Sequence, residues 1–255
     1  MTDQSFKGSI DVVLISTLRP DLLNLTLASF QKHFLDQFTD IRIIINIDPV
    51  GESSSSQEEL LKLVSTYSID IIHRTPSKGN FSQAVRWAWS QVESPYFLHL
   101  EDDWFLKKKV LKGAILEQFG LDEKLAGIRL NLSRNPKKQP LYSDGISLNP
   151  SVFKTSIIKS LLGDFDIDKD PEKQFRNHRL LNDYNFLYYG KKNEGSFVID
   201  TGKKWRKANS FSKWGADEKT ITWNRKTKSS SFGTFLYNLK YRFFISLWKI
   251  MLNFP

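Results

Sequence analysis

The chain has 255 residues, of which 40% are hydrophobic and 25% charged, a composition typical of one globular domain with a sizeable core. It contains no cysteine, which excludes disulfides, zinc–thiolate sites and thiol catalysis. The first residues are polar and lack the apolar run of a signal peptide, so a cytoplasmic location is expected.

Charge is unevenly spread along the chain. Residues 201–255 contain 12 Lys or Arg and only 2 Asp or Glu, which leaves 25 basic and 26 acidic residues in residues 1–200. A neutral body with a basic C-terminal part indicates an anionic partner, such as lipid headgroups, phosphates or nucleic acid.

The first half alternates between two kinds of segment. Short apolar runs rich in Ile, Val and Phe predict buried strands at 11–17, 41–48, 69–74 and 96–102. Helical spacing of apolar residues predicts helices from Pro20 to about residue 34, over 57–67 and from Asn80 to about residue 92. This alternation predicts an α/β layer fold with a largely parallel sheet.

The second half is less regular. Candidate strands cover 127–132, 145–153 and 196–200, and a helix is expected over much of 172–188. Residues 203–231 are basic and rich in Ser, which is typical of a loop or linker.

Polar groups follow the predicted strands, at the edge where open α/β sheets bind their ligands. These groups lie in Ser16-Thr17-Leu18-Arg19, Asp48-Pro49, Arg74, Ser77-Lys78-Gly79-Asn80 and Glu101-Asp102-Asp103-Trp104. Mg²⁺ and Mn²⁺ prefer carboxylate oxygens and leave positions for substrate phosphates. The acidic triplet is therefore a candidate metal site.

The acidic triplet also fits a solvated loop. Its flanks argue against this interpretation, since they are apolar on both sides, and adjacent carboxylates between buried flanks repel one another unless a cation is present. Taken singly, Asp48 fits a turn or cap before Pro49, and Arg19 fits a surface residue. The convergence of these groups at one edge is what indicates a site.

Residues 10–105 resemble, in the order and spacing of these segments, the family-2 glycosyltransferases and related enzymes of the GT-A fold. The acidic triplet takes the position of their D-x-D motif, with Glu101 in place of the usual first aspartate. Val85-Arg86 stands where that family usually has Arg-Asn. The resemblance implies an α/β fold of the GT-A (nucleotide-diphospho-sugar transferase) type, with a mostly parallel central sheet flanked by helices.

The same resemblance implies a nucleotide-sugar donor site. Asp48 matches the family's aspartate that contacts the nucleobase, and Asp103 matches the one that binds the metal, Mn²⁺ or Mg²⁺. The remaining expected donor-binding residues are Thr17, Arg19, Lys78, Glu101 and Asp102.

The acceptor side rests on looser matches. Glu172 lies where such enzymes often have an acidic catalytic residue at a helix start. A general base there would deprotonate an acceptor hydroxyl and imply inversion at the anomeric carbon. The alternative is an acid favoured by the helix dipole. Lys204 or Arg206 would close over the diphosphate, unless their segment is a solvated basic loop.

We therefore expect a catalytic domain over 1–231, with a nucleotide-sugar-binding half (10–105) and an acceptor-side half with a basic loop (106–231). The expected activity is metal-dependent transfer of a hexosyl-type sugar from a nucleotide-diphosphate donor to a glycan or lipid-linked glycan, as in polysaccharide biosynthesis. One alternative is a nucleotidyltransferase, although the first loop lacks the glycines that such enzymes use. The other is a non-catalytic, basic membrane-binding module. No nucleic-acid-binding signature is present, and no nucleic-acid partner is expected.

Residues 232–255 are expected to form an amphipathic, membrane-associating helix. Apolar residues recur at helical spacing, and Lys240, Arg242 and Lys249 lie among them. Cations at mid-bilayer depth cost about 2.5–3.5 kcal/mol each, so the pattern favours a helix in the membrane interface over one that crosses the bilayer. We expect peripheral association with the anionic inner face of a membrane. The alternative is packing on the catalytic domain or on a dimer partner.

Overall fold

The computed structural model describes residues 8–130, 145–190, 194–214, 222–225 and 232–252, with side chains left undescribed over 212–235 and at 237. Its centre is a seven-stranded sheet with the order β3-β2-β1-β4-β7-β6-β8. The strands of this sheet are β1 (Ser9–Leu18), β2 (Asp40–Gly51), β3 (Asp70–Arg74), β4 (Tyr96–Glu101), β6 (Leu125–Arg129), β7 (Ser151–Lys154) and β8 (Asn185–Tyr188).

The sheet is mostly parallel, as predicted. Strands β1, β2, β3 and β4 are parallel neighbours, β7 pairs antiparallel with both β4 and β6, and β8 is parallel to β6. The carboxyl ends of β1, β2, β3 and β4 therefore meet at one edge of the sheet.

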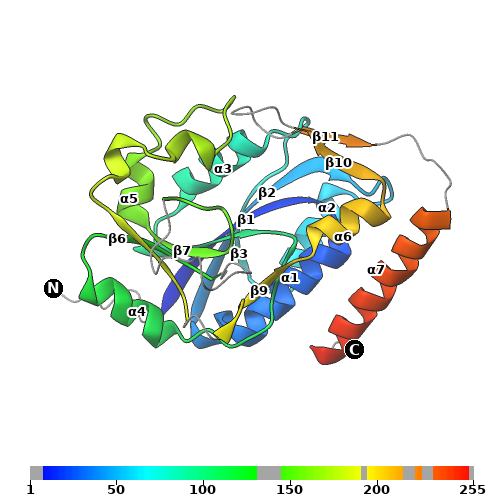
Figure 1. The fold of residues 1–255 in the computed structure, drawn as a ribbon, viewed down its shortest axis with the longest axis horizontal. Helices are drawn as coiled ribbons and strands as arrows, with labels where there is room; N and C mark the ends of the chain where they lie inside the picture. Colours follow the sequence, from blue (N-terminus) through cyan, green and yellow to red (C-terminus); the bar gives the residue numbers. More distant parts are fainter. Residues whose placement is uncertain (1–7, 131–144, 191–193, 215–221, 226–231, 253–255) are drawn as a thin grey trace.

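Helices cover both faces of the sheet (Figure 1). Their bounds are α1 (Pro20–His33), α2 (Gln57–Val64), α3 (Phe81–Gln91), α4 (Lys112–Leu121) and α5 (Thr155–Ser160). Successive side chains of β1 point to opposite faces, so Val12 and Leu14 pack in one cluster with α1, α2 and α4, while Val13 and Ile15 pack in the other with α3 and α5. The fully buried runs read from the sequence are thus explained by two-sided burial.

The structure corrects the prediction of a helix over much of 172–188. Only two short 3-10 helices form there, η4 (Lys173–Phe175) and η5 (Arg179–Leu181), and β8 follows them. Asn177 takes a left-handed backbone with φ of 61°, which interrupts any α-helix. Pairing with β6 then extends the chain from residue 185, so tertiary contacts override the local pattern.

The segment 203–231 is also more structured than a loop. It contains α6 (Gly202–Ala208) and the antiparallel pair β10 (Phe211–Trp214) and β11 (Thr222–Arg225). A second small sheet pairs β5 (Trp104–Leu106) with β9 (Val198–Asp200), which brings residue 200 beside the acidic triplet. Of the other predicted strands, the one at 145–153 forms only as β7, and residues 131 and 132 of the one at 127–132 lie outside the described residues.

The helix expected at the C-terminal end is present as α7 (Phe232–Met251). It lies beside α1 and α6 (Figure 1). None of the described helices is both long and apolar enough to cross a bilayer.

Candidate active site

Asp48 lies near the carboxyl end of β2 and is buried, with 7% of its surface exposed. Its carboxylate accepts a hydrogen bond from the Asn46 side chain at 2.8 Å. Burial raises the pKa of Asp48, against hydrogen bonds from Asn46 and the Asn80 backbone and the attraction of Arg74. A Cβ on Gly79 would stand 3.3 Å from this carboxylate, so the chain before α3 passes close to it. Asp48 and the loop around Gly79 are thus brought together, as the motif order predicted.

Arg19 forms the centre of a buried ion-pair cluster with Asp102 and Asp103. It lies between β1 and α1, is 2% exposed, and its guanidinium pairs with the Asp102 carboxylate and, at 3.0 Å, with Asp103. Burial disfavours the cation, but the two carboxylates raise the pKa of Arg19 above its ordinary value, so it stays protonated. The cation that the acidic residues require is supplied here by the protein itself.

Asp102 is held from several directions. Its carboxylate accepts hydrogen bonds from the Thr17 backbone at 2.9 Å and from the hydroxyls of Ser16 and Thr17. Its own backbone N–H donates to Ile15 and its carbonyl accepts from Thr26 of α1. Burial raises the pKa of Asp102, and the Arg19 charge opposes this. Asp102 is therefore a buried group that fixes the first loop and Arg19.

Asp103 is positioned by the start of α6. Its carbonyl accepts hydrogen bonds from the backbone and hydroxyl of Thr201, at 2.8 and 2.6 Å. A Cβ on Gly202 would stand 1.9 Å from the Asp103 carboxylate, so only glycine permits this approach. This contact between Gly202 and Asp103 depends on the pairing of β5 with β9, so the local sequence around either residue does not predict it.

Helix α6 closes over the buried ion pairs. Arg206 reaches to 4.0 Å from the Asp103 carboxylate, whereas Lys204 lies over the Phe244 ring of α7. Trp205 is fully buried, lies 5.4 Å from the Arg19 guanidinium and donates a hydrogen bond to Glu52. Of the two predicted cations, Arg206 reaches the acidic residues and Lys204 points to α7.

The remaining donor-side residues lie at the same edge. Thr17 is half-buried against Asp102, Glu101 is half-buried at the end of β4, and Lys78 is exposed before α3. The structure also adds four residues that contact the predicted site residues and were not predicted to belong to the site: Asn46, Thr201, Gly202 and Trp205. Of these, Asn46 is the one with a sequence signal, since it is a polar residue inside the buried run that ends at Asp48.

A metal at this edge would have to be shared with a substrate, because the described acidic residues do not form a complete metal site by themselves. Within the described residues there is no group of three or more His, Cys, Asp or Glu side chains that could hold an ion. The Asp102 carboxylate is already committed to Arg19 and the first loop. Mg²⁺ and Mn²⁺ commonly bind one or two carboxylates together with substrate phosphates, so Asp103 and Glu101 are the acidic residues to test for such a site.

Glu172 lies on the other half of the sheet, in the turn that leads into η4. It is half-buried, and its carboxylate accepts a hydrogen bond from the Leu148 backbone at 2.7 Å. Asp170 caps this turn by accepting from the backbones of Glu172 and Lys173. The preceding loop is tied to the start of α3, because Ser82 donates to the Lys169 carbonyl. Glu172 thus belongs to a loop anchored beside the donor half.

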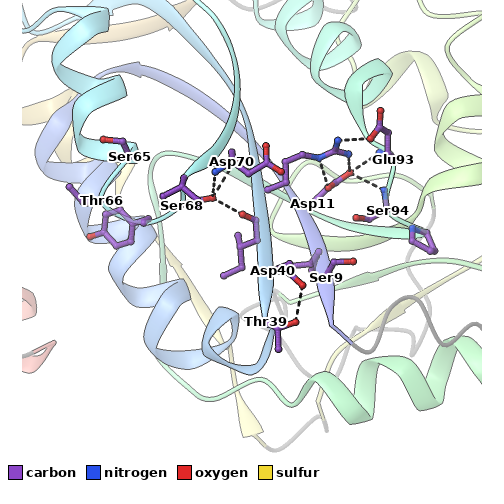
Figure 2. A pocket seen from close by; sticks show the side chains of 16 residues that line it. Ser9, Asp11, Thr39, Asp40, Ser65, Thr66, Ser68, Asp70, Glu93 and Ser94 are labelled. Atoms are coloured by element: carbon purple, nitrogen blue, oxygen red, sulfur yellow. Dashed lines mark hydrogen bonds and ion pairs between the residues drawn. The ribbon is translucent and has the colours of Figure 1, made fainter.

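A separate hollow of about 910 Å³ opens at the opposite edge, around the first residues of β1, β2 and β3 (Figure 2). Arg42, the cation among its lining residues, binds Asp11 at 2.7 Å and Glu93 at 2.5 Å. Burial by itself would raise the pKa of Asp11, but Arg42 and two backbone N–H groups hold it below its usual value. The ion pairs of Arg42 lie at the amino ends of the strands, and none of their residues belongs to the predicted site.

No family model matches the chain, and neither does any curated protein by sequence. Among solved structures, it is similar to the mannosyltransferase PcManGT from Pyrobaculum calidifontis in complex with GDP-Man and Mn²⁺. The TM-score is 0.56 at 8% identity, over 78% of this chain and 61% of that one. It is also similar to S. aureus TarS 1-349, with a TM-score of 0.51 at 14% identity, over 78% of this chain and 62% of that one.

The chain spans less than two thirds of the length of either protein. Identities this low make the likeness one of fold alone. The chain has a GT-A-like α/β fold.

Proposed function

We propose that this chain transfers a sugar from a nucleotide-diphosphate donor to a hydroxyl of a glycan or lipid-linked glycan, in the cytoplasm. The observation that carries the proposal is the convergence of Asp48, the Arg19–Asp102–Asp103 cluster and Arg206 at the carboxyl edge of a GT-A-like sheet. That edge is where open α/β sheets bind nucleotides.

The donor would lie along this edge in a fixed direction. Asp48, with the loop of Lys78 and Gly79 beside it, would bind the nucleoside, because a buried carboxylate is a strong acceptor for nucleobase or ribose donors. Thr17 would line the same edge, and Arg206 would bind the diphosphate as it gains charge. Arg19 and Asp102 would contribute through Asp103, since their polar groups already engage one another.

Asp103 and Glu101 would hold Mn²⁺ or Mg²⁺ together with the diphosphate oxygens. The ion, when bound, supplies charge neutralisation for the departing diphosphate. Arg19 keeps the Asp103 carboxylate in place before any donor arrives, and the Thr201 and Gly202 contacts fix its backbone. Such preorganisation avoids the cost of rearranging the site during the reaction.

Glu172 would serve as the general base on the acceptor side. It would take the proton of the attacking hydroxyl, and attack on the face opposite the diphosphate would invert the anomeric centre. The anchoring of its loop to α3 supports this role, because that anchoring holds the acceptor half against the donor half.

The donor site can be tested by nucleotide binding. We expect one of UDP, GDP, CMP and dTDP to raise the melting temperature, more strongly with Mn²⁺, and Asp103→Asn to weaken the Mn²⁺-dependent binding at least about ten-fold by calorimetry. Asp36→Asn is the control, because Asp36 is an exposed acid at the opposite edge. If no nucleotide binds, the proposal fails. If binding is equally tight without Mn²⁺ and in Asp103→Asn, Asp103 is not a metal ligand.

A further inference from the structure

Helix α7 has two apolar faces, and within the part of the chain that the structure describes only the inner one is covered by the rest of the protein. On the inner face, Ile245 is 5% exposed, and the Trp248 and Phe105 ring centroids are 3.9 Å apart. The inner face packs in one cluster with Leu22 and Leu25 of α1 and Trp205 of α6. Lys249 pairs with Asp21 at 3.0 Å, so polar contacts also fix α7 on the domain.

The outer face of α7 is an apolar stripe that none of the described residues covers. Six of the ten exposed large hydrophobic residues in the described structure belong to this one helix. They are Leu236, Leu239, Phe243, Leu247, Ile250 and Met251, with Ile250 73% and Phe243 68% exposed. Their spacing places them on one side of the helix, opposite the inner face. Exposed apolar stripes of this kind mark interaction surfaces.

The charged residues of α7 itself are all positive. Lys240 and Arg242 are exposed on the same helix, and no Asp or Glu occurs after Glu218, whereas seven Lys or Arg do. A second copy of the chain placed face to face near Phe243 would bring Lys240 and Arg242 of both copies together with no acid of α7 between them. Like charges at that distance repel. The charge pattern instead complements an anionic surface.

We propose that the outer face of α7 lies in the headgroup region of an anionic lipid bilayer, with the helix parallel to the membrane. Apolar side chains would enter the boundary with the acyl chains, and Lys240 and Arg242 would bind the phosphates. Because the inner face stays on α1 and α6, the domain is held directly on the surface. α6 also carries Arg206 and contacts Asp103, so the candidate active site lies one helix away from the membrane-bound face.

The test is flotation of the full chain with phosphatidylcholine vesicles, with and without phosphatidylglycerol. We expect flotation with the anionic vesicles and weaker flotation in high salt. Phe243→Gln should reduce the affinity at least about ten-fold, because it removes the most central apolar side chain of the stripe. Ser246→Gln is the matched control, an exposed position on the same helix that should float as the wild type does. Lys240→Gln should weaken binding about five-fold, and only to the anionic vesicles.

Circular dichroism and melting temperatures should be the same for all variants, since these side chains are exposed. Equal flotation of wild type and Phe243→Gln, or no flotation of wild type, would overturn the proposal. A concentration-dependent dimer that Phe243→Gln abolishes, without flotation, would assign the stripe to a second copy. Flotation requires neither donor nor acceptor, so its outcome is independent of the nucleotide-binding test.

Discussion

Arg19 shows how a single side chain can resolve the electrostatic problem posed by adjacent acids. Asp102 and Asp103 are 1% and 4% exposed, and their charges could not coexist there without a nearby cation. The guanidinium has donors for both carboxylates at once, which an ammonium group would not offer in a fixed geometry. Read alone, Arg19 fits a surface arginine, yet the structure makes it one of the most deeply buried side chains.

Glu172 is the residue on which the proposed chemistry depends most. Glu172→Gln should lower kcat about 10²–10⁴-fold and leave the affinity for the nucleotide nearly unchanged, because a general base acts only in the transition state. The amide keeps an oxygen that can accept the hydrogen bond from Leu148, so the loop should stay folded. Steady-state kinetics together with nucleotide calorimetry would measure both quantities.

Asp183→Asn provides the comparison, because Asp183 is an exposed acid nearby in sequence. If Glu172→Gln retains near-normal kcat, the base is another carboxylate. A loss of kcat accompanied by an equal loss of nucleotide affinity would instead assign Glu172 to the structure of the loop.

At the level of elements, α7 allows its two faces to be compared with one residue type. Ile245→Ala should lower the free energy of unfolding by about 2–4 kcal/mol, since it leaves a cavity among buried side chains. Ile250→Ala, on the outer face, should change it by less than about 0.5 kcal/mol. Urea denaturation would measure both. Equal effects at the two positions would contradict the packing of α7 on the domain.

The sequence predicts the first half of the fold well because its patterns are local. Strands such as 11–17 and 41–48 are buried on both faces, and the helices between them keep one apolar face, so composition and spacing identify both. Asp48 and Asp103 could be placed at one edge for the same reason. The second half depends on distant pairing, as in β5 with β9 and β8 with β6, and its strands are only three to five residues long.

The contacts of Arg19 and Gly202 lay beyond prediction for a similar reason. Arg19 meets Asp102 83 positions further along the chain, and Gly202 meets Asp103 only because α6 returns to the acidic residues. Neither partner is visible in a local window. For the C-terminal helix, membrane association was the expectation, and packing on the domain or on a dimer partner was the alternative. The structure confirms the packing, and membrane contact stays a proposal for the other face.

Across the whole molecule, stability should depend on pH through a histidine in the core. His99 is fully buried in β4, its Nδ1 accepts a hydrogen bond from Trp89 at 3.2 Å, and burial lowers its pKa to about 3. In the unfolded chain the His99 imidazole binds a proton near pH 6.5, whereas in the folded chain it binds one only near pH 3. The contribution of neutral His99 is therefore complete above about pH 6.5 and is lost progressively as pH falls toward 3.

The free energy of unfolding should accordingly fall by up to about 1.4 kcal/mol per pH unit through this one group between pH 6 and pH 4. His99→Gln should flatten the slope, whatever its effect on stability at neutral pH. His73→Gln, at an exposed histidine of β3, should keep the wild-type slope. Urea titrations at a series of pH values would give the three slopes, and identical slopes for wild type and His99→Gln would refute the assignment.

The close approach of Gly202 to Asp103 has a consequence for how related chains can be found. An acidic triplet after a strand is a common and ambiguous motif, but this contact ties it to a second pattern about 100 residues later. The pattern is Thr201-Gly202 followed by Trp205. The Thr201 hydroxyl donates a hydrogen bond to the Asp103 carbonyl, Gly202 leaves room for the Asp103 carboxylate, and the Trp205 indole lies near the Arg19 guanidinium. A homologue that conserves the buried arginine and the acids must conserve the glycine as well, because an alanine would displace the carboxylate. The two patterns together form a search signature that neither provides alone.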